Sequence, residues 1–116
     1  MHILLVEDHQ DSRELLARSL TARGHDVVAA GDMRSAVYLL EKLRFDAIIS
    51  DIALPDGTGY ALIDAARRRG IQALGIAVSA FSFPEDVEEP GVTGFQYHLN
   101  KPINCDQLCF LLEKTV

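Results

Sequence analysis

Short apolar runs alternate with amphipathic segments along the whole of this chain. Five short runs are rich in hydrophobic residues, and they lie at residues 3–6, 27–30, 47–49, 73–78 and 95–99. The first four show no regular alternation of polar and apolar positions, which is typical of parallel strands that helices cover on both faces. The sequence therefore predicts the five strands of a parallel sheet.

The segments between these runs have the periodicity of helices that bury one face. Apolar residues recur every three or four positions at residues 12–23, 33–43, 59–69 and 104–114. Gly24 and Gly70 follow two of these segments, at positions where glycine commonly ends a helix. One more helix, the fourth in chain order, is predicted to begin at Pro84 and to end before Pro90. We expect this helix to be short or irregular.

Alternation of strands and helices predicts an α/β fold. We expect a (βα)5 protein with a doubly wound, parallel, five-stranded sheet in the flavodoxin-like strand order 2-1-3-4-5. No internal repeat or interdomain linker interrupts the pattern, so residues 1–116 are expected to form one domain.

Composition narrows the classes of function. The net charge of −6 disfavours nucleic acid and anionic membrane surfaces as direct partners. The apolar runs are much shorter than a membrane-spanning helix. Cys105 and Cys109 are the only cysteines, and they lie four positions apart within one predicted helix. We expect both thiols to be reduced and to pack as small apolar groups, which favours a cytoplasmic protein.

Acidic residues stand at the ends of two predicted strands. Glu7 and Asp8 follow the first strand, and Asp51 follows the third. Ligands of an open parallel sheet bind beyond the carboxyl ends of the strands, where the strand order reverses, so we expect the three carboxylates to converge there. Carboxylates about 4 Å apart would repel each other by roughly 4 kcal/mol, and a divalent cation would relieve this repulsion. Mg²⁺ fits best because it prefers oxygen ligands, with Mn²⁺ as an alternative; simple solvation of acids at strand ends is the competing interpretation.

Two further strand ends carry groups that bind phosphate. Ser79 lies at the end of the fourth strand and provides a hydroxyl, and Lys101 follows the fifth strand and provides an ammonium group. A metal site, a cation and a hydroxyl at one edge of the sheet can together stabilise a phosphoryl group during transfer. The sequence therefore indicates phosphoryl chemistry at this edge.

The same residues resemble the motifs of a response-regulator receiver domain of two-component signalling. They fall within the segments LLVEDH, SDIALPDGTG, VSA and HLNKP, which occur in this order and span essentially the whole chain. The resemblance implies that Asp51 is the phosphoacceptor, a carboxylate nucleophile that takes a phosphoryl group from a histidine kinase or a histidine phosphotransfer domain. The segment HLNKP is similar to the receivers of hybrid sensor histidine kinases.

The resemblance also implies how the metal is held. Asp8 would be a direct ligand of Mg²⁺, and Glu7 would act partly through water. Asp51 and the backbone carbonyl of Ala53 would be the remaining ligands from the protein.

The resemblance also implies how the domain would relay the signal. Lys101 would pair with Asp51 and then with the phosphate, and Ser79 would hydrogen-bond a phosphoryl oxygen. Movement of Ser79 would let His98 swing inward as a switch, although the family usually has Tyr or Phe at this position. A partly buried, hydrogen-bonded ring without a regulatory role is the other interpretation of His98.

Two other classes of function compete with a phosphoaccepting receiver, which acts on itself rather than as an enzyme on other molecules. A receiver fold that signals without phosphorylation would be a protein-interaction module, and the short helix after Pro84 motivates this alternative. An aspartate-based phosphohydrolase would need a second acid two residues after Asp51, where this chain has Ala53. A weak homodimer is a further option, and an exposed Phe110 on the last helix would offer a partner surface.

Overall fold

A computed structural model gives the structure of the chain and describes residues 1–80 and 94–114. Its elements, in chain order, are β1 (His2–Val6), α1 (Gln10–Ala22), β2 (Asp26–Ala30), α2 (Met33–Lys42), β3 (Ala47–Asp51), β4 (Ala53–Leu54), β5 (Gly57–Thr58), α3 (Gly59–Arg68), β6 (Leu74–Ser79), β7 (Tyr97–Asn100) and α4 (Cys105–Lys114). The short helix predicted to begin at Pro84 lies outside the described residues.

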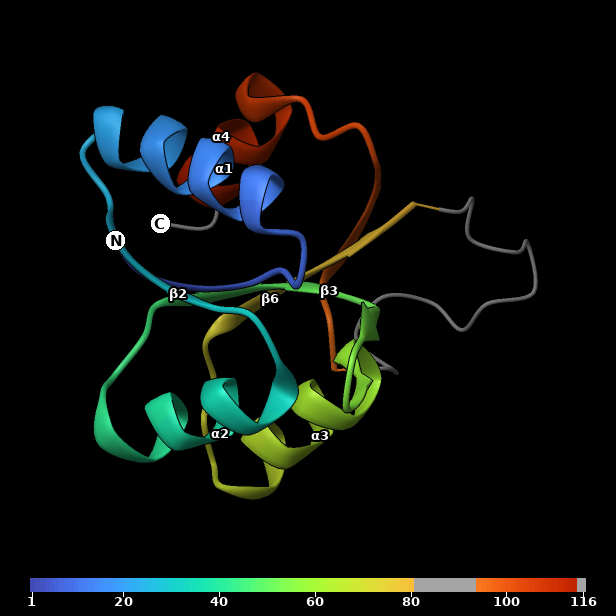
Figure 1. Ribbon diagram of the computed structural model, residues 1–116. Coiled ribbons are helices and arrows are strands. Elements are labelled where there is room, and N and C mark those ends of the chain that lie inside the picture. The colour runs from blue at the N-terminus through green and yellow to red at the C-terminus, as the bar shows by residue number, and fades with distance from the viewer. Residues whose placement is uncertain (81–93, 115–116) are drawn as a thin grey trace.

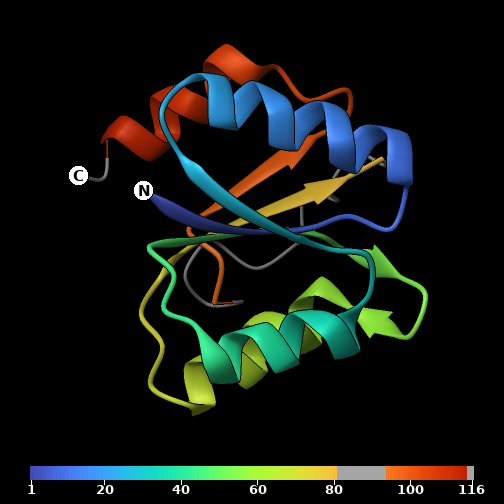
Figure 2. The ribbon, with the colours of Figure 1, turned by 60° about the vertical axis from the view of Figure 1, so that its left-hand side comes forward.

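Five strands form one parallel sheet in the order β2-β1-β3-β6-β7. This is the predicted flavodoxin-like order, because β6 and β7 are the fourth and fifth strands of this sheet. Helices α1 and α4 cover one face of the sheet, and α2 and α3 cover the other (Figures 1 and 2). The predicted three-layer α/β architecture is therefore confirmed.

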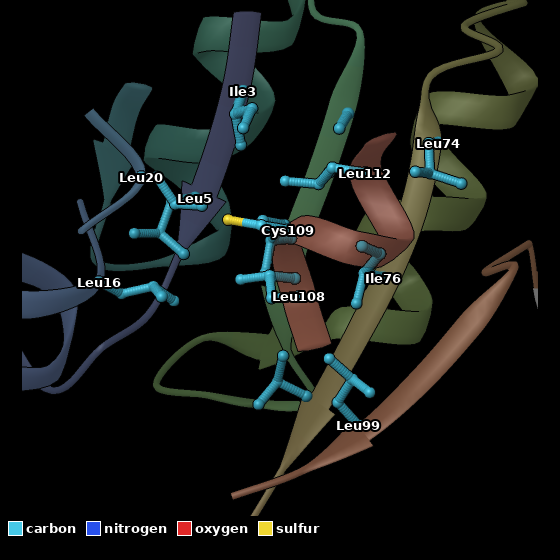
Figure 3. Packing of buried hydrophobic residues seen from close by; sticks show 13 residues of the cluster. Ile3, Leu5, Leu16, Leu20, Leu74, Ile76, Leu99, Leu108, Cys109 and Leu112 are labelled. Carbon is cyan, nitrogen blue, oxygen red and sulfur yellow. The ribbon is translucent and has the colours of Figure 1, made fainter. Parts of the chain in front are cut away.

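The apolar runs are continuous because the sheet has two buried faces. Successive side chains of β1 enter different clusters: Ile3 and Leu5 face α1 and α4, whereas Leu4 and Val6 face α2 and α3. Figure 3 shows the first cluster, in which side chains of the strands meet Leu108 and other residues of α4. Burial on both sides explains why these strands lack the alternating pattern of a half-exposed sheet.

A second, two-stranded sheet follows β3 and was missing from the sequence prediction. Strands β4 and β5 pair in antiparallel register, with Ala53 opposite Thr58 and Leu54 opposite Gly57. Thr58 then begins α3 as its N-cap, because its hydroxyl oxygen accepts a hydrogen bond from the backbone N–H of Ala61 at 3.1 Å.

The surface features expected from the sequence are present in part. Phe110 lies on the outer side of α4 and is 63% exposed, which is the exposed placement that the sequence allowed. Cys109 is buried, Cys105 is half-buried, and neither forms a disulfide. Across residues 1–80 and 94–114, no helix combines the length and the apolar character needed to cross a membrane.

Candidate functional site

Strand register brings the predicted site residues to one edge of the sheet. Val6 lies beside Ser50, so Glu7 and Asp8 leave β1 next to Asp51, the last residue of β3. On the other side of β3, β6 ends at Ser79, whose register partner is Asn100 of β7. Lys101 follows directly, and its backbone N–H donates a hydrogen bond to the carbonyl oxygen of Ser79 at 2.7 Å. Residues from four strands therefore meet beyond the carboxyl ends of the sheet, as the strand order requires.

Three carboxylates converge at this edge. One carboxylate oxygen from each of Glu7, Asp8 and Asp51 lies within 4.8 Å of the others. Glu7 is 4% exposed and Asp51 is 7% exposed, whereas Asp8 is open to solvent. Two of the three acids are therefore largely removed from water, where an unpaired charge is costly.

The ammonium group of Lys101 bridges the two buried acids. Its Nζ lies 2.8 Å from Oδ2 of Asp51, and 2.9 and 2.8 Å from Oε1 and Oε2 of Glu7. The sequence had paired Lys101 with Asp51 alone, and the structure adds Glu7 as a second partner. One ammonium group against three carboxylates leaves the cluster with two negative charges.

Burial and charge shift the proton affinity of these groups. Burial raises the pKa of Glu7, and the neighbouring Asp51 raises it further, although the hydrogen bond from Lys101 works in the opposite direction. Burial alone would lower the pKa of Lys101, but its hydrogen bonds to Asp51 and Glu7 and their charges raise it above the ordinary value. Lys101 is therefore held in its charged form between the two acids.

The donor set fits Mg²⁺. All three converging side chains offer carboxylate oxygens, which are the ligands that this hard cation prefers, and the exposed Asp8 leaves room for bound water. Ala53 lies two residues after Asp51 at the start of β4, and its backbone N–H donates to Oδ1 of Asp51 at 3.2 Å. The predicted ligand roles of the acids and of the Ala53 carbonyl remain predictions.

The two predicted switch residues lie on β6 and β7, the fourth and fifth strands of the sheet. Ser79 is half-buried at the end of β6, and His98 is half-buried in β7 beside Ala77. The His98 ring makes an edge-to-face contact with Phe95, with ring centroids 6.1 Å apart. Burial lowers the pKa of His98, which favours its neutral form. Its switching role remains a prediction.

Asp56 is a structural residue that the sequence did not single out. It lies in the turn between β4 and β5, and its carboxylate accepts hydrogen bonds from the backbone N–H groups of Met33 at 2.8 Å and Arg34 at 3.0 Å. These N–H groups belong to the first turn of α2, where they have no partner within the helix. The turn after the acid cluster is thereby fastened to a helix that lies more than twenty residues earlier in the chain.

A groove opens beside the acid cluster, between α1 and the segment that joins β7 to α4. Its volume is about 520 Å³. The lining includes Glu7 and Lys101 together with apolar side chains, among them Leu15, which is 69% exposed. An approaching partner would therefore meet apolar surface directly next to the charged cluster.

Comparison with known proteins gives consistent matches over nearly the whole chain. Residues 3–113 match the family described as the response regulator receiver domain. The sensor histidine kinase RcsC of Escherichia coli (strain K12) is 33% identical over 106 residues, which make up 91% of this chain and 11% of that protein. The chain thus spans only a small part of the length of this curated relative.

Solved structures agree with the sequence matches. The chemotaxis response regulator CheY4 of Vibrio cholerae superimposes with a TM-score of 0.89 at 29% identity, covering 99% of this chain and 98% of that one. The response regulator TrrA of Thermotoga maritima, solved in complex with Mg²⁺ and BeF, gives a TM-score of 0.87 at 25% identity, covering 99% and 98%. Both structures are similar to this chain over nearly its whole length.

Proposed function

The chain belongs to the response regulator receiver domain family of two-component signalling, and we propose that it accepts a phosphoryl group on Asp51 in a reaction that requires Mg²⁺. One observation carries this proposal: Glu7, Asp8 and Asp51 converge within 4.8 Å, and Lys101 lies 2.8 Å from Asp51. The proposal treats residues 1–116 as one receiver domain, a signalling phosphoacceptor rather than a typical enzyme.

The phosphoryl donor in this proposal is a phosphohistidine of a histidine kinase or a histidine phosphotransfer domain. A carboxylate oxygen of Asp51 attacks phosphorus, the P–O bond forms, and the P–N bond breaks with its electron pair left on the imidazole nitrogen. Hydrolysis of the aspartyl phosphate by water later returns the carboxylate and inorganic phosphate. The similarity to RcsC, which is named a sensor histidine kinase, supports a donor of this class.

The surrounding residues have distinct roles in the proposal. Glu7, Asp8, Asp51 and the Ala53 carbonyl would hold Mg²⁺, which neutralises charge on the transferring phosphoryl group. Lys101 supplies a second positive charge next to Asp51, 2.8 Å from its Oδ2. These groups act by electrostatics and positioning, which provide most of the catalysis in phosphoryl transfer.

Signal relay would follow from the same contacts. Ser79 would hydrogen-bond a phosphoryl oxygen, and its movement would change the space available to His98. The hydrogen bond from the Lys101 N–H to the Ser79 carbonyl links the cation to the end of β6, which supports coupling between these two segments. Neighbouring elements would transmit this change to a partner protein.

The setting of the domain is also part of the proposal. Two free thiols support a reducing compartment, and we propose a cytoplasmic location. The net charge of −6 argues against direct binding of nucleic acid or anionic membrane. A weak homodimer remains a proposal, and exposed Phe110 is the apolar residue of α4 that it could use.

Phosphorylation by a small donor tests the proposal directly. Acetyl phosphate with Mg²⁺ should add one phosphoryl group per chain that is stable to acid and labile to base, as measured by intact mass. Asp51→Asn should remove it, whereas the control Asp64→Asn, at a solvent-exposed position on α3, should leave it unchanged. Equal labelling of Asp51→Asn, or labelling that continues in excess EDTA, would contradict the proposal.

A further inference from the structure

Arg13 reaches the turn that carries the two N-terminal acids. It lies in α1 and is half-buried, and its Nη1 donates a hydrogen bond to the backbone carbonyl of Glu7 at 2.8 Å. The same nitrogen lies 3.5 Å from the backbone carbonyl of Asp8, at the limit of a hydrogen bond. One guanidinium group therefore contacts the backbone of Glu7 and of Asp8, two of the three acids that converge at the expected cation site.

The contact completes the hydrogen bonding of Glu7. The Glu7 N–H donates to the carbonyl of Ala30 at 3.0 Å, and the carboxylate accepts from Lys101 and, at 3.3 Å, from the N–H of His9. Without Arg13, the carbonyl of this buried residue would lose the hydrogen bond that the structure gives it, which is costly. The backbone of Glu7 is thus held from two sides, by β2 and by α1.

Asp8 depends on this backbone for its position. Within residues 1–80 and 94–114, the side chain of Asp8 accepts no hydrogen bond, and it is exposed. Its carboxylate nevertheless lies within 4.8 Å of those of Glu7 and Asp51. The direction of the peptide between Glu7 and Asp8 therefore determines where this carboxylate stands, and Arg13 fixes the carbonyl of that peptide.

Gly31 leaves the space through which the guanidinium group reaches the turn. A Cβ atom built on Gly31 would lie 2.8 Å from Nη1 of Arg13 and 3.6 Å from its Cζ. The φ angle of Gly31 is outside the left-handed region, so alanine can adopt this backbone. An added methyl group at residue 31 would therefore displace the end of the Arg13 side chain and leave Arg13 and its charge in the protein.

We propose that Arg13 is a positioning residue that sets the Glu7–Asp8 turn for the divalent cation, and that Gly31 acts in the same role by admitting the guanidinium group. The inference rests on the proposed Mg²⁺-dependent function and adds to it two residues outside the ligand set. Loss of the positive charge of Arg13 would by itself strengthen Mg²⁺ binding, because the nearby acid cluster is negative and one cation that repels Mg²⁺ is removed. Loss of the turn geometry would instead weaken binding. The two effects have opposite signs, so they can be separated.

Titration with Mg²⁺ alone, followed by amide chemical shifts in NMR, tests this role. Arg13→Ala should raise the dissociation constant for Mg²⁺ about fivefold to tenfold, and Gly31→Ala should do the same with the charge retained. The double variant should bind no more weakly than Arg13→Ala, because Gly31 acts through Arg13. Arg18→Ala removes an equal charge from an exposed position of the same helix and should not weaken binding.

A purely structural contribution gives a different result. In that case Arg13→Ala and Gly31→Ala lower the free energy of unfolding in EDTA but leave the dissociation constant for Mg²⁺ at its wild-type value. A wild-type dissociation constant in both folded variants overturns the inference. If Gly31→Ala weakens Mg²⁺ binding as much in the Arg13→Ala variant as in the wild type, Gly31 does not act through Arg13, and the role assigned to Gly31 is overturned. Gly31→Ala removes no hydrogen-bonding group, so it tests the role even if Arg13→Ala does not fold. Wild-type protein that binds no Mg²⁺ would refute the proposed function itself.

Discussion

Lys101 is the residue on which the charge balance of the site depends. It contacts two acids that are buried, and both would be left without this cation if its ammonium group were removed. Removing one partner of a buried ion pair is strongly destabilising because the other charge stays out of water. The side chain of Lys101 is partly exposed, so the effect is smaller here than in a fully buried pair.

Lys101→Met should therefore lower the free energy of unfolding in EDTA by about 2 kcal/mol. Mg²⁺ should stabilise this variant more than it stabilises the wild type, because the cluster then carries three negative charges instead of two and binds the cation more tightly. Urea denaturation with and without Mg²⁺ measures both effects. Lys114→Met, at an exposed position on α4, is the control; equal Mg²⁺ stabilisation of Lys101→Met and wild type would contradict this account.

His98 makes folding depend on pH. Burial lowers its pKa in the folded protein, so the unfolded chain takes up a proton at a higher pH, near the ordinary histidine value of about 6.5. The free energy of unfolding should therefore fall as the pH falls below about 6.5. His98→Phe should make this slope shallower below about pH 6.5, as followed by urea denaturation at each pH.

His25 supplies the internal comparison for this measurement. Burial and the N-terminal ammonium group also lower its pKa, so part of the slope should persist in His98→Phe. The difference between wild type and variant isolates His98. If the free energy of unfolding changes with pH equally in His98→Phe and in the wild type, the environment of His98 does not favour the neutral ring over the charged one.

At the scale of elements, the start of α3 lies unusually close to the end of β3. A Cβ atom on Gly59 would lie 2.5 Å from the backbone oxygen of Asp51 and 3.2 Å from Cα of Ile52. These two backbone atoms cannot move away as the end of a flexible side chain can. Glycine at this position therefore lets the helix begin against the strand that carries Asp51.

Gly59→Ala should lower the free energy of unfolding by about 3 kcal/mol, since relief of the clash requires a backbone shift. Gly57→Ala is the matched control two residues earlier: its Cβ would meet the thioether end of Met33 at 2.7 Å, which can rotate away. We expect a cost below about 1 kcal/mol for this control. Equal costs for the two variants, measured by urea denaturation, would show that α3 can move away from β3 freely.

At the scale of the whole molecule, a single sheet joins two apolar clusters that do not share side chains. Leu112 of α4 lies in one cluster and Leu62 of α3 lies in the other, and both are completely buried. Every strand that contributes to both clusters must form before either face can pack. Folding of the two layers is therefore expected to be cooperative.

Leu112→Ala and Leu62→Ala should each lower the free energy of unfolding by about 3 kcal/mol. For each variant, unfolding followed by far-UV circular dichroism and by tyrosine fluorescence should give the same midpoint. A variant with two separate transitions would show that one helical layer unfolds while the other remains packed.

The groove beside the acid cluster also belongs to the whole molecule, because α1 and the segment after β7 form it together. Leu15→Ala should slow phosphotransfer from a phosphorylated histidine protein about tenfold, since it removes exposed apolar surface next to the site. The rate with acetyl phosphate should not change, because this donor needs no protein contact. Phe110→Ala, which removes exposed apolar surface on α4, is the control and should leave both rates unchanged. Equal slowing of Leu15→Ala with the histidine protein and with acetyl phosphate would contradict a docking role.

Sequence alone was sufficient for the five-stranded parallel sheet and for the identity of the converging groups, but not for the β4–β5 sheet. Apolar runs with no alternation are typical of strands covered on both faces, and helical periodicity between them leaves few parallel topologies. The acids and the lysine could be placed at one edge because every strand of a parallel sheet ends there. Glu7, Asp51 and Lys101 do lie together at that edge.

Only the tertiary structure decided which groups touch and how they are held. The pairing of Lys101 with Glu7 joins residues far apart in the chain, the hold of Asp56 on the first turn of α2 crosses between elements, and Arg13 reaches the acid turn through the space above Gly31. The physical reason is that local sequence sets backbone preference and the buried face. Contacts between distant side chains depend instead on strand register and helix placement, which exist only once the whole core has packed.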